Sequence, residues 1–180
     1  MDKEDIDIRL VEITDLHEAA LKGFNRYQVT NRVRYKENNL YLYKDDYFID
    51  HWDEHKKQQV IQSLQKCIYA GGIVAGAFMN DEIIGFASVE GEFFGRKREY
   101  LELSYIHISN EYRKRGIGKL LFTLCCEKAK AKGAGMLYIS AHPAVETQQF
   151  YMTMGCVLAV EVNREIYERE PLDIQLEFTL

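Results

Sequence analysis

A cationic, glycine-containing stretch runs from Arg113 to Lys119 with the sequence Arg-Lys-Arg-Gly-Ile-Gly-Lys. Apolar residues recur at helical spacing directly after it, so a helix begins within the stretch. The first backbone N–H groups of a helix have no intrahelical partner and lie at the positive end of the helix dipole. Gly116 and Gly118 let an anion approach these groups closely. The stretch therefore predicts a site for a phosphate or pyrophosphate.

The spacing of the glycines excludes two common phosphate loops. A P-loop needs Ser or Thr after its lysine, but Lys119 is followed by Leu120. A dinucleotide fingerprint needs a third glycine where Leu121 stands. A nucleotide-binding protein or phosphate-binding transferase of another class stays as an alternative. It would need the Walker-type lysine and the magnesium-binding hydroxyl that this stretch lacks.

A larger α/β domain must position this turn. The residue pattern predicts strands at about 6–13, 73–79, 83–89, 100–109, 136–140, 156–162 and 174–180, and helices at about 14–27, 54–69, 117–132 and 145–154. Residues 31–52 alternate polar and aromatic side chains, which fits either a hairpin or an irregular loop. This element order predicts an α/β fold with a mixed sheet.

Two segments of the chain resemble signatures of the GNAT superfamily of N-acetyltransferases. Arg113-x-x-Gly116-x-Gly118 resembles its acetyl-CoA signature Q/R-x-x-G-x-G/A, and Phe150-Tyr151-Met-Thr-Met-Gly155-Cys156 resembles its F-Y-x-x-x-G-F segment. The element order is similar over most of the chain. The resemblance implies the GNAT fold in one domain, 1–180: a mixed, mostly antiparallel central sheet flanked by helices, with two strands splayed at the CoA site. It also makes residues 31–53 a variable segment that shapes the substrate pocket.

The same resemblance assigns two catalytic residues. Tyr151 is implied as the general acid that protonates the leaving CoA thiolate, since a phenol has an ordinary pKa of ~10. Glu102, fourteen positions before Gly116, matches the general-base glutamate of the histone acetyltransferase branch, with an ordered water as the alternative base. Each residue also has a structural alternative, a core tyrosine bonded to backbone and a solvated glutamate. His107 and His142 stand nearby as polar neighbours or a second base.

The resemblance further implies the contacts to acetyl-CoA. Backbone groups on the strand before the turn are expected to hold the pantetheine arm, and the turn to hold the phosphates. Many relatives carry an asparagine where Ala144 stands here, so Ser140 or Thr147 is expected to replace that contact. The expected cofactor-binding residues are Ile106, His107, Ile108, Arg113, Lys114, Arg115, Gly116, Ile117, Gly118, Lys119, Ser140 and Thr147.

The implied reaction is N-acetylation of a primary amine by direct attack in a ternary complex, because no cysteine or serine lies in a recognisable nucleophile motif. Residues 31–54 combine six aromatic side chains with Asp45, Asp46 and Asp50 among others, which favours a small cationic acceptor. A non-catalytic acyl-CoA-binding module and an enzyme acting on a protein amine remain as alternatives. Whether the protein forms a homodimer is left open.

Composition and charge exclude several other classes of protein. The 180 residues carry 23 basic and 28 acidic side chains, a net charge of −5, which argues against a general nucleic-acid binder. No apolar run approaches the ~20 residues of a membrane helix, and the acidic Met1–Asp7 predicts no secretory leader. Four cysteines without a C-x-x-C pair predict a reduced, cytoplasmic protein. His51 and His55 lack a third ligand, so no metal is expected.

Overall fold

The computed structural model describes residues 5–180; residues 1–4, part of the acidic N-terminal stretch, lie outside them. The strands are β1 (Asp7–Leu10), β2 (Tyr27–Glu37), β3 (Leu40–His51), β4 (Ile73–Met79), β5 (Glu82–Val89), β6 (Tyr100–Ile108), β7 (Met136–Ala141), β8 (Val157–Leu158) and β9 (Ile174–Thr179). The helices are α1 (Glu54–Tyr69), α2 (Ile117–Ala131), α3 (Val145–Met154) and α4 (Arg164–Arg169), with short 3-10 turns at Ile13–Asp15 and Asn110–Tyr112.

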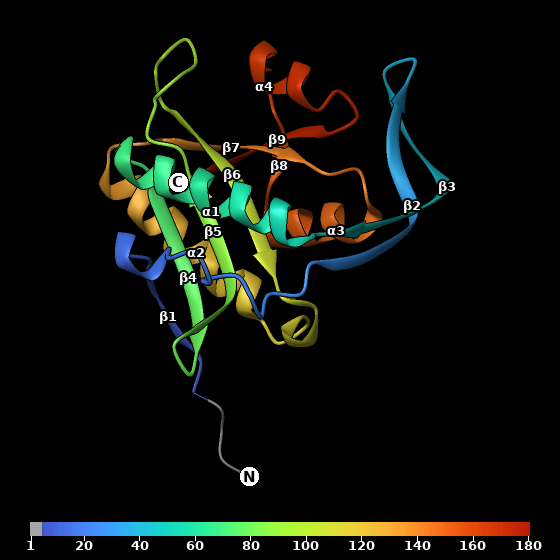
Figure 1. The fold of residues 1–180 in the computed structure, drawn as a ribbon. Coiled ribbons are helices and arrows are strands. Elements are labelled where there is room, and N and C mark those ends of the chain that lie inside the picture. The colour runs from blue at the N-terminus through green and yellow to red at the C-terminus, as the bar shows by residue number, and fades with distance from the viewer. Residues whose placement is uncertain (1–4) are drawn as a thin grey trace.

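The central sheet has seven strands in the order β1-β4-β5-β6-β7-β9-β8. Neighbouring strands are antiparallel except β6 and β7, which run parallel. β2 and β3 form a separate two-stranded sheet that stands at one side of the molecule (Figure 1). A mixed, mostly antiparallel sheet flanked by helices was expected, and the fold confirms that expectation.

Two helices cover opposite faces of this sheet, α1 in front and α2 behind it in Figure 1. Leu121 and Cys125 of α2 are fully buried in one apolar core, and Val60 and Leu64 of α1 are buried in the other. The α1 helix begins where the Asp53 side chain accepts a hydrogen bond from the backbone N–H of Lys56. Its bounds match the apolar periodicity of the sequence, as do those of α3.

Asn-containing turns close both hairpins of the N-terminal half. Asn80 and Asp81 join β4 to β5 with φ of 50° and 63°, and Asn38 and Asn39 join β2 to β3 with φ of 48° and 62°. Two successive residues with positive φ are typical of type I′ hairpin turns, which match the twist of the strands. Of the two alternatives for residues 31–52, the structure therefore shows the hairpin.

The predicted helix over residues 14–27 was wrong: a 3-10 turn and further turns replace it. Side chains of α1 bind the carbonyl groups that a helix would use internally. Gln65 Nε2 donates to the Leu16 carbonyl at 2.8 Å, and Lys57 Nζ donates to the Lys22 carbonyl at 3.1 Å. Packing against α1 thus overrides the local helical pattern.

The end of the chain also differs from expectation. The predicted strand over 156–162 shortens to β8, and the six-residue α4 follows where no helix was expected. Asn163 caps α4 by accepting a hydrogen bond from the Ile166 N–H at 3.1 Å. Because Ile166 is the only buried residue of this short helix, it shows no apolar periodicity that a sequence reading could detect.

Candidate active site

The strands β6 and β7 separate in the middle of the sheet. Their pairing runs from Tyr100 opposite Met136 to Glu102 opposite Tyr138, and β6 then continues to Ile108 without it. A register shift in the β5–β6 ladder at Ser88 and Val89 marks a bulge in the same part of β6. Among residues 5–180, one edge of residues 103–108 therefore has no strand partner, which leaves backbone hydrogen-bonding groups available to a ligand.

A cleft of about 460 Å³ lies beside the end of β6 and the start of α2, and we call it the α2 cleft. Many residues predicted to bind the cofactor meet there from separate parts of the chain. Those that line it are Ile106, His107, Ile108, Arg113, Lys114, Gly116, Ile117, Gly118, Lys119 and Thr147. Arg115 and Ser140 do not line it, so their predicted cofactor contacts have no support from this geometry.

The start of α2 has the geometry that an anion site needs. Gly116, the residue before the helix, has φ of 82°, and nothing lies within 4 Å of the position where a Cβ would stand. The first helical N–H bond within α2 runs from Leu120 to the Gly116 carbonyl, which leaves the N–H groups before it open. Arg113 is held beside them by a hydrogen bond from its Nε to the Ile108 carbonyl at 3.1 Å.

Arg26 also lines the α2 cleft, although nothing in its sequence context pointed to it. It lies in the segment that was predicted as helix and is 9% exposed. Its Nη1 donates to Gln28 Oε1 at 2.7 Å, and its Nε has no partner among residues 5–180. Burial, with the charge of Arg113, lowers the pKa of Arg26 to about 10. Arg26 thus remains cationic at neutral pH and adds positive charge to the cleft.

Tyr151 of α3 reaches the same cleft and is 5% exposed. Its ring packs against Phe150 and Phe122, with centroid distances of 5.2 and 6.5 Å. Within the described part of the chain its hydroxyl makes no hydrogen bond, in contrast to the core tyrosines Tyr100 and Tyr138, whose hydroxyls are bonded. Burial is the main cause that raises the pKa of Tyr151 well above its ordinary value. The phenol therefore stays protonated and is free to donate.

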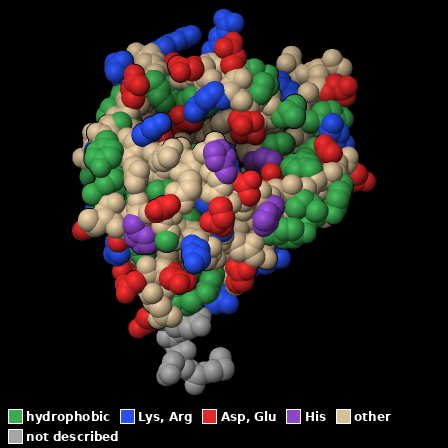
Figure 2. Space-filling view, in the orientation of Figure 1, with side chains coloured by type: hydrophobic (Ala, Val, Ile, Leu, Met, Phe, Trp, Pro, Cys, Tyr) green, Lys and Arg blue, Asp and Glu red, His purple; other side chains and the backbone are tan. Residues whose placement is uncertain are grey.

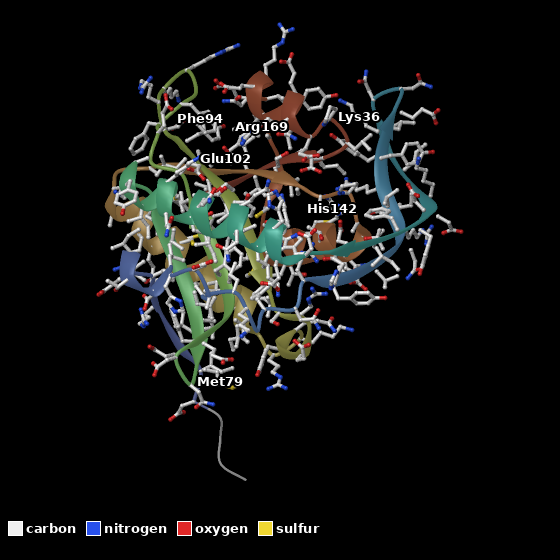
Figure 3. The ribbon with its side chains drawn as sticks, viewed as in Figure 1. Lys36, Met79, Phe94, Glu102, His142 and Arg169 are labelled. Atoms are coloured by element: carbon white, nitrogen blue, oxygen red, sulfur yellow. The ribbon has the colours of Figure 1, made fainter. Side chains whose placement is uncertain are left out.

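A second hollow, of about 510 Å³, lies between α1, the start of the β6–β7 gap and α4, and we call it the α4 hollow. Glu102 lines this hollow and does not line the α2 cleft. It is held by Arg169, whose Nη2 donates to Glu102 Oε1 at 2.6 Å; Figure 3 shows the two residues side by side. Burial raises the pKa of Glu102, and the charge of Arg169 opposes that effect.

Acidic side chains outnumber basic ones around the α4 hollow. Its carboxylates are Glu90, Glu102, Glu170 and Asp173, and its cations are Lys66 and Arg169. The face of the molecule that carries α1 and α4 is hollowed, with acidic and basic side chains around the rim (Figure 2). Such a hollow favours a cationic guest over an anionic one.

Ser140 lies in a hydrogen-bonded chain on the floor of the α4 hollow. Its Oγ donates to Asp173 Oδ2 at 3.1 Å and accepts from Gln175 Nε2 at 2.9 Å. Gln175 Oε1 in turn accepts from the Tyr138 hydroxyl at 2.7 Å. Burial is the largest cause that raises the pKa of Asp173, to about 6. No motif or residue pattern in the sequence pointed to Asp173.

The two histidines near the site are poor proton acceptors. Burial lowers the pKa of His107 well below its ordinary value, and its ring stands edge-on to Trp52 at 5.0 Å. Burial also lowers the pKa of His142, whose Nδ1 already accepts the Ala144 N–H at 3.1 Å. Burial thus disfavours the charged form of both rings, and the Nδ1 lone pair of His142 is already occupied.

The hairpin β2–β3 places its own cations over the tyrosines that its sequence offered to a cationic acceptor. Its tyrosines are contacted by cations of the same hairpin, among them Arg34 over Tyr41 at 4.5 Å and Lys44 over Tyr35 at 5.3 Å. Asp45 and Asp46 are exposed. With Lys36, Lys44 and Tyr41, the hairpin lines a third hollow of about 890 Å³ against residues 158–175, which we call the hairpin hollow.

Two negative findings hold for residues 5–180. No group of three or more His, Cys, Asp or Glu side chains is placed to hold a metal ion there. His55 instead contacts Gln59 on the exposed face of α1, with 3.1 Å between their Nε2 atoms. No helix in this range is long and apolar enough to cross a membrane.

Comparison with protein families gives one match, to the acetyltransferase (GNAT) family, over residues 37–156 of this chain. The matched region contains β6, the Arg113–Lys119 turn, α2 and α3, which are the elements that build the α2 cleft. A sequence comparison with curated proteins gives no match.

Solved structures of similar fold include several acetyltransferases. A nourseothricin acetyltransferase is 15% identical with a TM-score of 0.69, covering 97% of this chain and 98% of its own. A candidate streptothricin acetyltransferase from Bacillus anthracis, in complex with acetyl coenzyme A, is 16% identical with a TM-score of 0.68, covering 99% of each chain. The PaiA N-acetyltransferase from Thermoplasma acidophilum, in complex with coenzyme A, is 16% identical with a TM-score of 0.61, covering 98% of this chain and 99% of its own. At these identities the likeness is one of fold.

Proposed function

The chain belongs to the acetyltransferase (GNAT) family, and from this premise we propose that it transfers an acetyl group from acetyl-CoA to a primary amine, most readily a small cationic one. The observation that carries the proposal is the α2 cleft. It joins an open helix start, four cations and an unpaired edge of β6 in one cavity. A pyrophosphate with a pantetheine arm needs this combination, because the phosphates are anionic and the arm carries amide groups.

In this proposal the pyrophosphate lies at the start of α2, where the N–H groups of Ile117, Gly118 and Lys119 face it. Arg113 adds positive charge on one side of that position. Gly118 is needed for close approach of α3, since a Cβ at this position would stand 3.2 Å from the Phe150 ring. The pantetheine arm follows residues 106–108 toward the gap between β6 and β7, which brings the thioester beneath Tyr151.

The acetyl transfer is proposed as direct attack of the amine on the thioester. A backbone N–H among residues 106–108 stabilises the oxyanion, because these groups lie on the edge without a strand partner. Tyr151 protonates the departing thiolate, a role supported by its buried, unbonded hydroxyl. Glu102 or an ordered water takes the proton of the amine. The ion pair between Glu102 and Arg169 argues against Glu102 as the base, because Arg169 already binds its carboxylate.

The acceptor is proposed to enter from the α4 hollow, whose carboxylates favour a cation. Streptothricin and nourseothricin belong in the first panel of acceptors, because structures of the same fold carry those names. A protein amine is the alternative acceptor. A module that binds acyl-CoA without catalysis is the alternative function, and the unbonded hydroxyl of Tyr151 favours catalysis over it.

The test is release of CoA from acetyl-CoA with a panel of amines, beside thermal shifts with acetyl-CoA, CoA and ATP. Acetyl-CoA and CoA are expected to raise the melting temperature and ATP is not, because a ligand stabilises the state that binds it. Stabilisation by acetyl-CoA without turnover of small or protein amines would leave the non-catalytic module as the function. Stabilisation by ATP alone would overturn the assignment of the α2 cleft.

A further inference from the structure

We propose that Asp173, immediately before β9, is the carboxylate that accepts the proton of the acceptor amine. This inference rests on the proposed acetyl transfer and replaces Glu102 as the base in that reaction. It follows from where Asp173 lies, what holds it and what surrounds it. Asp173 is compared with Glu102, which lines the same α4 hollow, in each of these respects.

Asp173 lies where two hollows meet. It lines the α4 hollow of about 510 Å³ and the hairpin hollow of about 890 Å³. Its partner Ser140 lies on β7 two residues beyond Tyr138, the last residue of β7 that pairs with β6. The carboxylate is therefore attached to the splayed part of the sheet, whereas Glu102 stands on the last paired residue before the gap. An amine entering from either hollow reaches Asp173 as it approaches the gap.

The hydrogen bonds of Asp173 orient its carboxylate without neutralising it. Ser140 Oγ donates to Oδ2 at 3.1 Å, and Gln175 fixes that hydroxyl by donating to it at 2.9 Å. No donor reaches Oδ1 within residues 5–180, so this oxygen is open to the ligand. Glu102, in contrast, is bound by the guanidinium of Arg169. A base must offer a free lone pair, and Asp173 does so without breaking an ion pair.

The electrostatic surroundings make Asp173 a stronger base than an ordinary aspartate. Burial raises its pKa to about 6, with Ser140 lowering the pKa and Glu170 raising it. The other charged or titratable groups that line the two hollows come from every element around them. They are Lys66 and Cys67 of α1, Glu90 directly after β5, Glu102 and Tyr105 of β6, Tyr167 and Arg169 of α4, and Tyr35, Lys36, Tyr41 and Lys44 of the hairpin. Tyr151 of α3 also interacts with the charge of Asp173. At neutral pH the carboxylate is ionised and still accepts a proton readily.

The proposed reaction passes protons through both Asp173 and Tyr151. Asp173 takes one proton from the ammonium, and the amine nitrogen forms a bond to the thioester carbon. When the C–S bond breaks, Tyr151 donates its proton to the sulfur and recovers one from the nitrogen of the new amide. Asp173 releases its proton to solvent, so each turnover yields amide, CoA and one proton. After burial and Cys156, the charge of Asp173 is a cause of the raised pKa of Tyr151. Protonation of Asp173 thus makes Tyr151 a better acid at the step that needs it.

The kinetic test compares Asp173→Asn with wild type, using streptothricin and spermidine as probe acceptors. Asparagine keeps the shape and can still accept the Ser140 hydrogen bond, so the fold and the thermal shift with acetyl-CoA are expected to persist. We expect kcat to fall by about 10²–10³-fold, the usual effect of losing a positioned base. Wild-type kcat/KM is expected to show an added break near pH 6, below which activity falls as Asp173 becomes protonated. Full activity of Asp173→Asn would overturn the proposal. A break near pH 6 that persists in the pH profile of Asp173→Asn would also overturn it.

Two variants of residues beside Asp173 test whether it acts as a base or has only a structural role, because each is expected to change its pKa. Ser140→Ala removes the hydroxyl that lowers the pKa of Asp173, so the break is expected to move to higher pH. Glu170→Gln removes a charge that raises this pKa, so the break is expected to move to lower pH. A structural role for Asp173 predicts no movement in either direction. Breaks that stay in place in both variants would contradict the assignment.

A measurement without turnover keeps this inference separate from the proposed function. The side-chain carboxyl of Asp173 can be followed by ¹³C NMR in the acetyl-CoA complex, from about pH 4 to about pH 8. Its signal can be assigned by its loss in Asp173→Asn. We expect this signal to titrate near pH 6 in the wild type and at a higher pH in Ser140→Ala. A signal that titrates at or below about pH 4, the ordinary range of an aspartate, would overturn the inference. A wild-type protein that shows the expected titration but acetylates no amine would instead fail the proposed function.

Discussion

The α2 cleft and the α4 hollow lie along successive parts of β6, residues 106–108 and residues 102–105, yet they differ in charge and in construction. The cleft gathers Arg26, Arg113, Lys114 and Lys119 and is built mainly from three short continuous segments of the chain. The α4 hollow gathers carboxylates from β6 and from the residues directly after β5, directly after α4 and directly before β9. In the proposed function, an anionic cosubstrate and a cationic acceptor therefore bind at separate sites, and the reacting groups meet at the gap between β6 and β7.

The two cavities also differ in how far apart in sequence their lining residues lie. Most of the residues that we propose to bind the cosubstrate lie in one strand end and the helix start that follows it. The acceptor side depends on side chains from elements distant in sequence, such as Arg169 on Glu102. We infer that substitutions in the α2 cleft change affinity for acetyl-CoA, and that substitutions in the α4 hollow change the choice and rate of the acceptor.

The largest effect is expected at Tyr151, where the cleft and the hollow act on the same reaction. Tyr151→Phe keeps the ring contacts with Phe122 and Phe150 and removes only the hydroxyl. We expect kcat to fall by about 10²–10⁴-fold with little change in the KM for acetyl-CoA, since the proton moves only in the transition state. Steady-state kinetics with the best amine, beside the melting temperature, measure this. Full activity with a lowered melting temperature would assign Tyr151 to the core instead.

The next effect tests whether the α2 cleft binds phosphate through the helix start. Gly116→Asp and Gly116→Asn both suit the positive φ of this position about equally well, because Asp and Asn tolerate it. Only aspartate places a negative charge at the helix start, where it can also cap the helix. We expect Gly116→Asp to raise the Kd of acetyl-CoA by about 10- to 100-fold and Gly116→Asn by clearly less. Calorimetry measures the Kd of acetyl-CoA for both variants. Equal losses of affinity in the two would contradict a phosphate site at the helix start.

A smaller effect separates the phosphate contacts from the pantetheine contacts of the cleft. Arg113→Ala is expected to weaken CoA by about 10-fold, because charge-assisted bonds to phosphate are lost, and to leave a phosphate-free pantetheine analogue nearly unchanged. Arg115→Ala is the matched control: its guanidinium lies 5.1 Å from the centre of the Tyr112 ring, and it does not line the cleft. Equal losses for both ligands in Arg113→Ala would show that Arg113 does not contact phosphate.

The smallest effects compare the α4 hollow with the hairpin as the site that holds the acceptor cation. Glu102→Gln removes one charge from the hollow and is expected to raise the KM of a cationic amine by about 5-fold, the scale of one charge contact that solvent partly screens. Replacing Asp45 and Asp46 by asparagine is expected to change it by less than about 2-fold, because both residues are exposed. The KM for acetyl-CoA is the internal control in both. A larger effect of the Asp45 and Asp46 variant than of Glu102→Gln would indicate that the hairpin binds the acceptor instead.

Much of the fold was predictable because its elements carry their own signals. Apolar periodicity placed α1 and α3 at the residues where the structure has them, and Asn80-Asp81 marked the hairpin turn. The helix predicted over residues 14–27 was wrong because side chains of α1 bind backbone carbonyl groups of that segment. These contacts join residues about 40 or more positions apart in sequence. The short α4 has one buried residue and therefore no detectable period.

The sequence by itself determined the family, the turn at Arg113–Lys119 and the candidate acid Tyr151, because each depends on residues that are neighbours along the chain. Only the tertiary structure decided the partners of the acceptor side. It brought Arg169 to Glu102, Ser140 to Asp173, and Arg26 into the cleft. Hydrogen-bond partners and burial depend on which distant elements pack together, and burial sets the pKa of a carboxyl group. No local pattern carries that information, so the base could not be chosen before the fold was known.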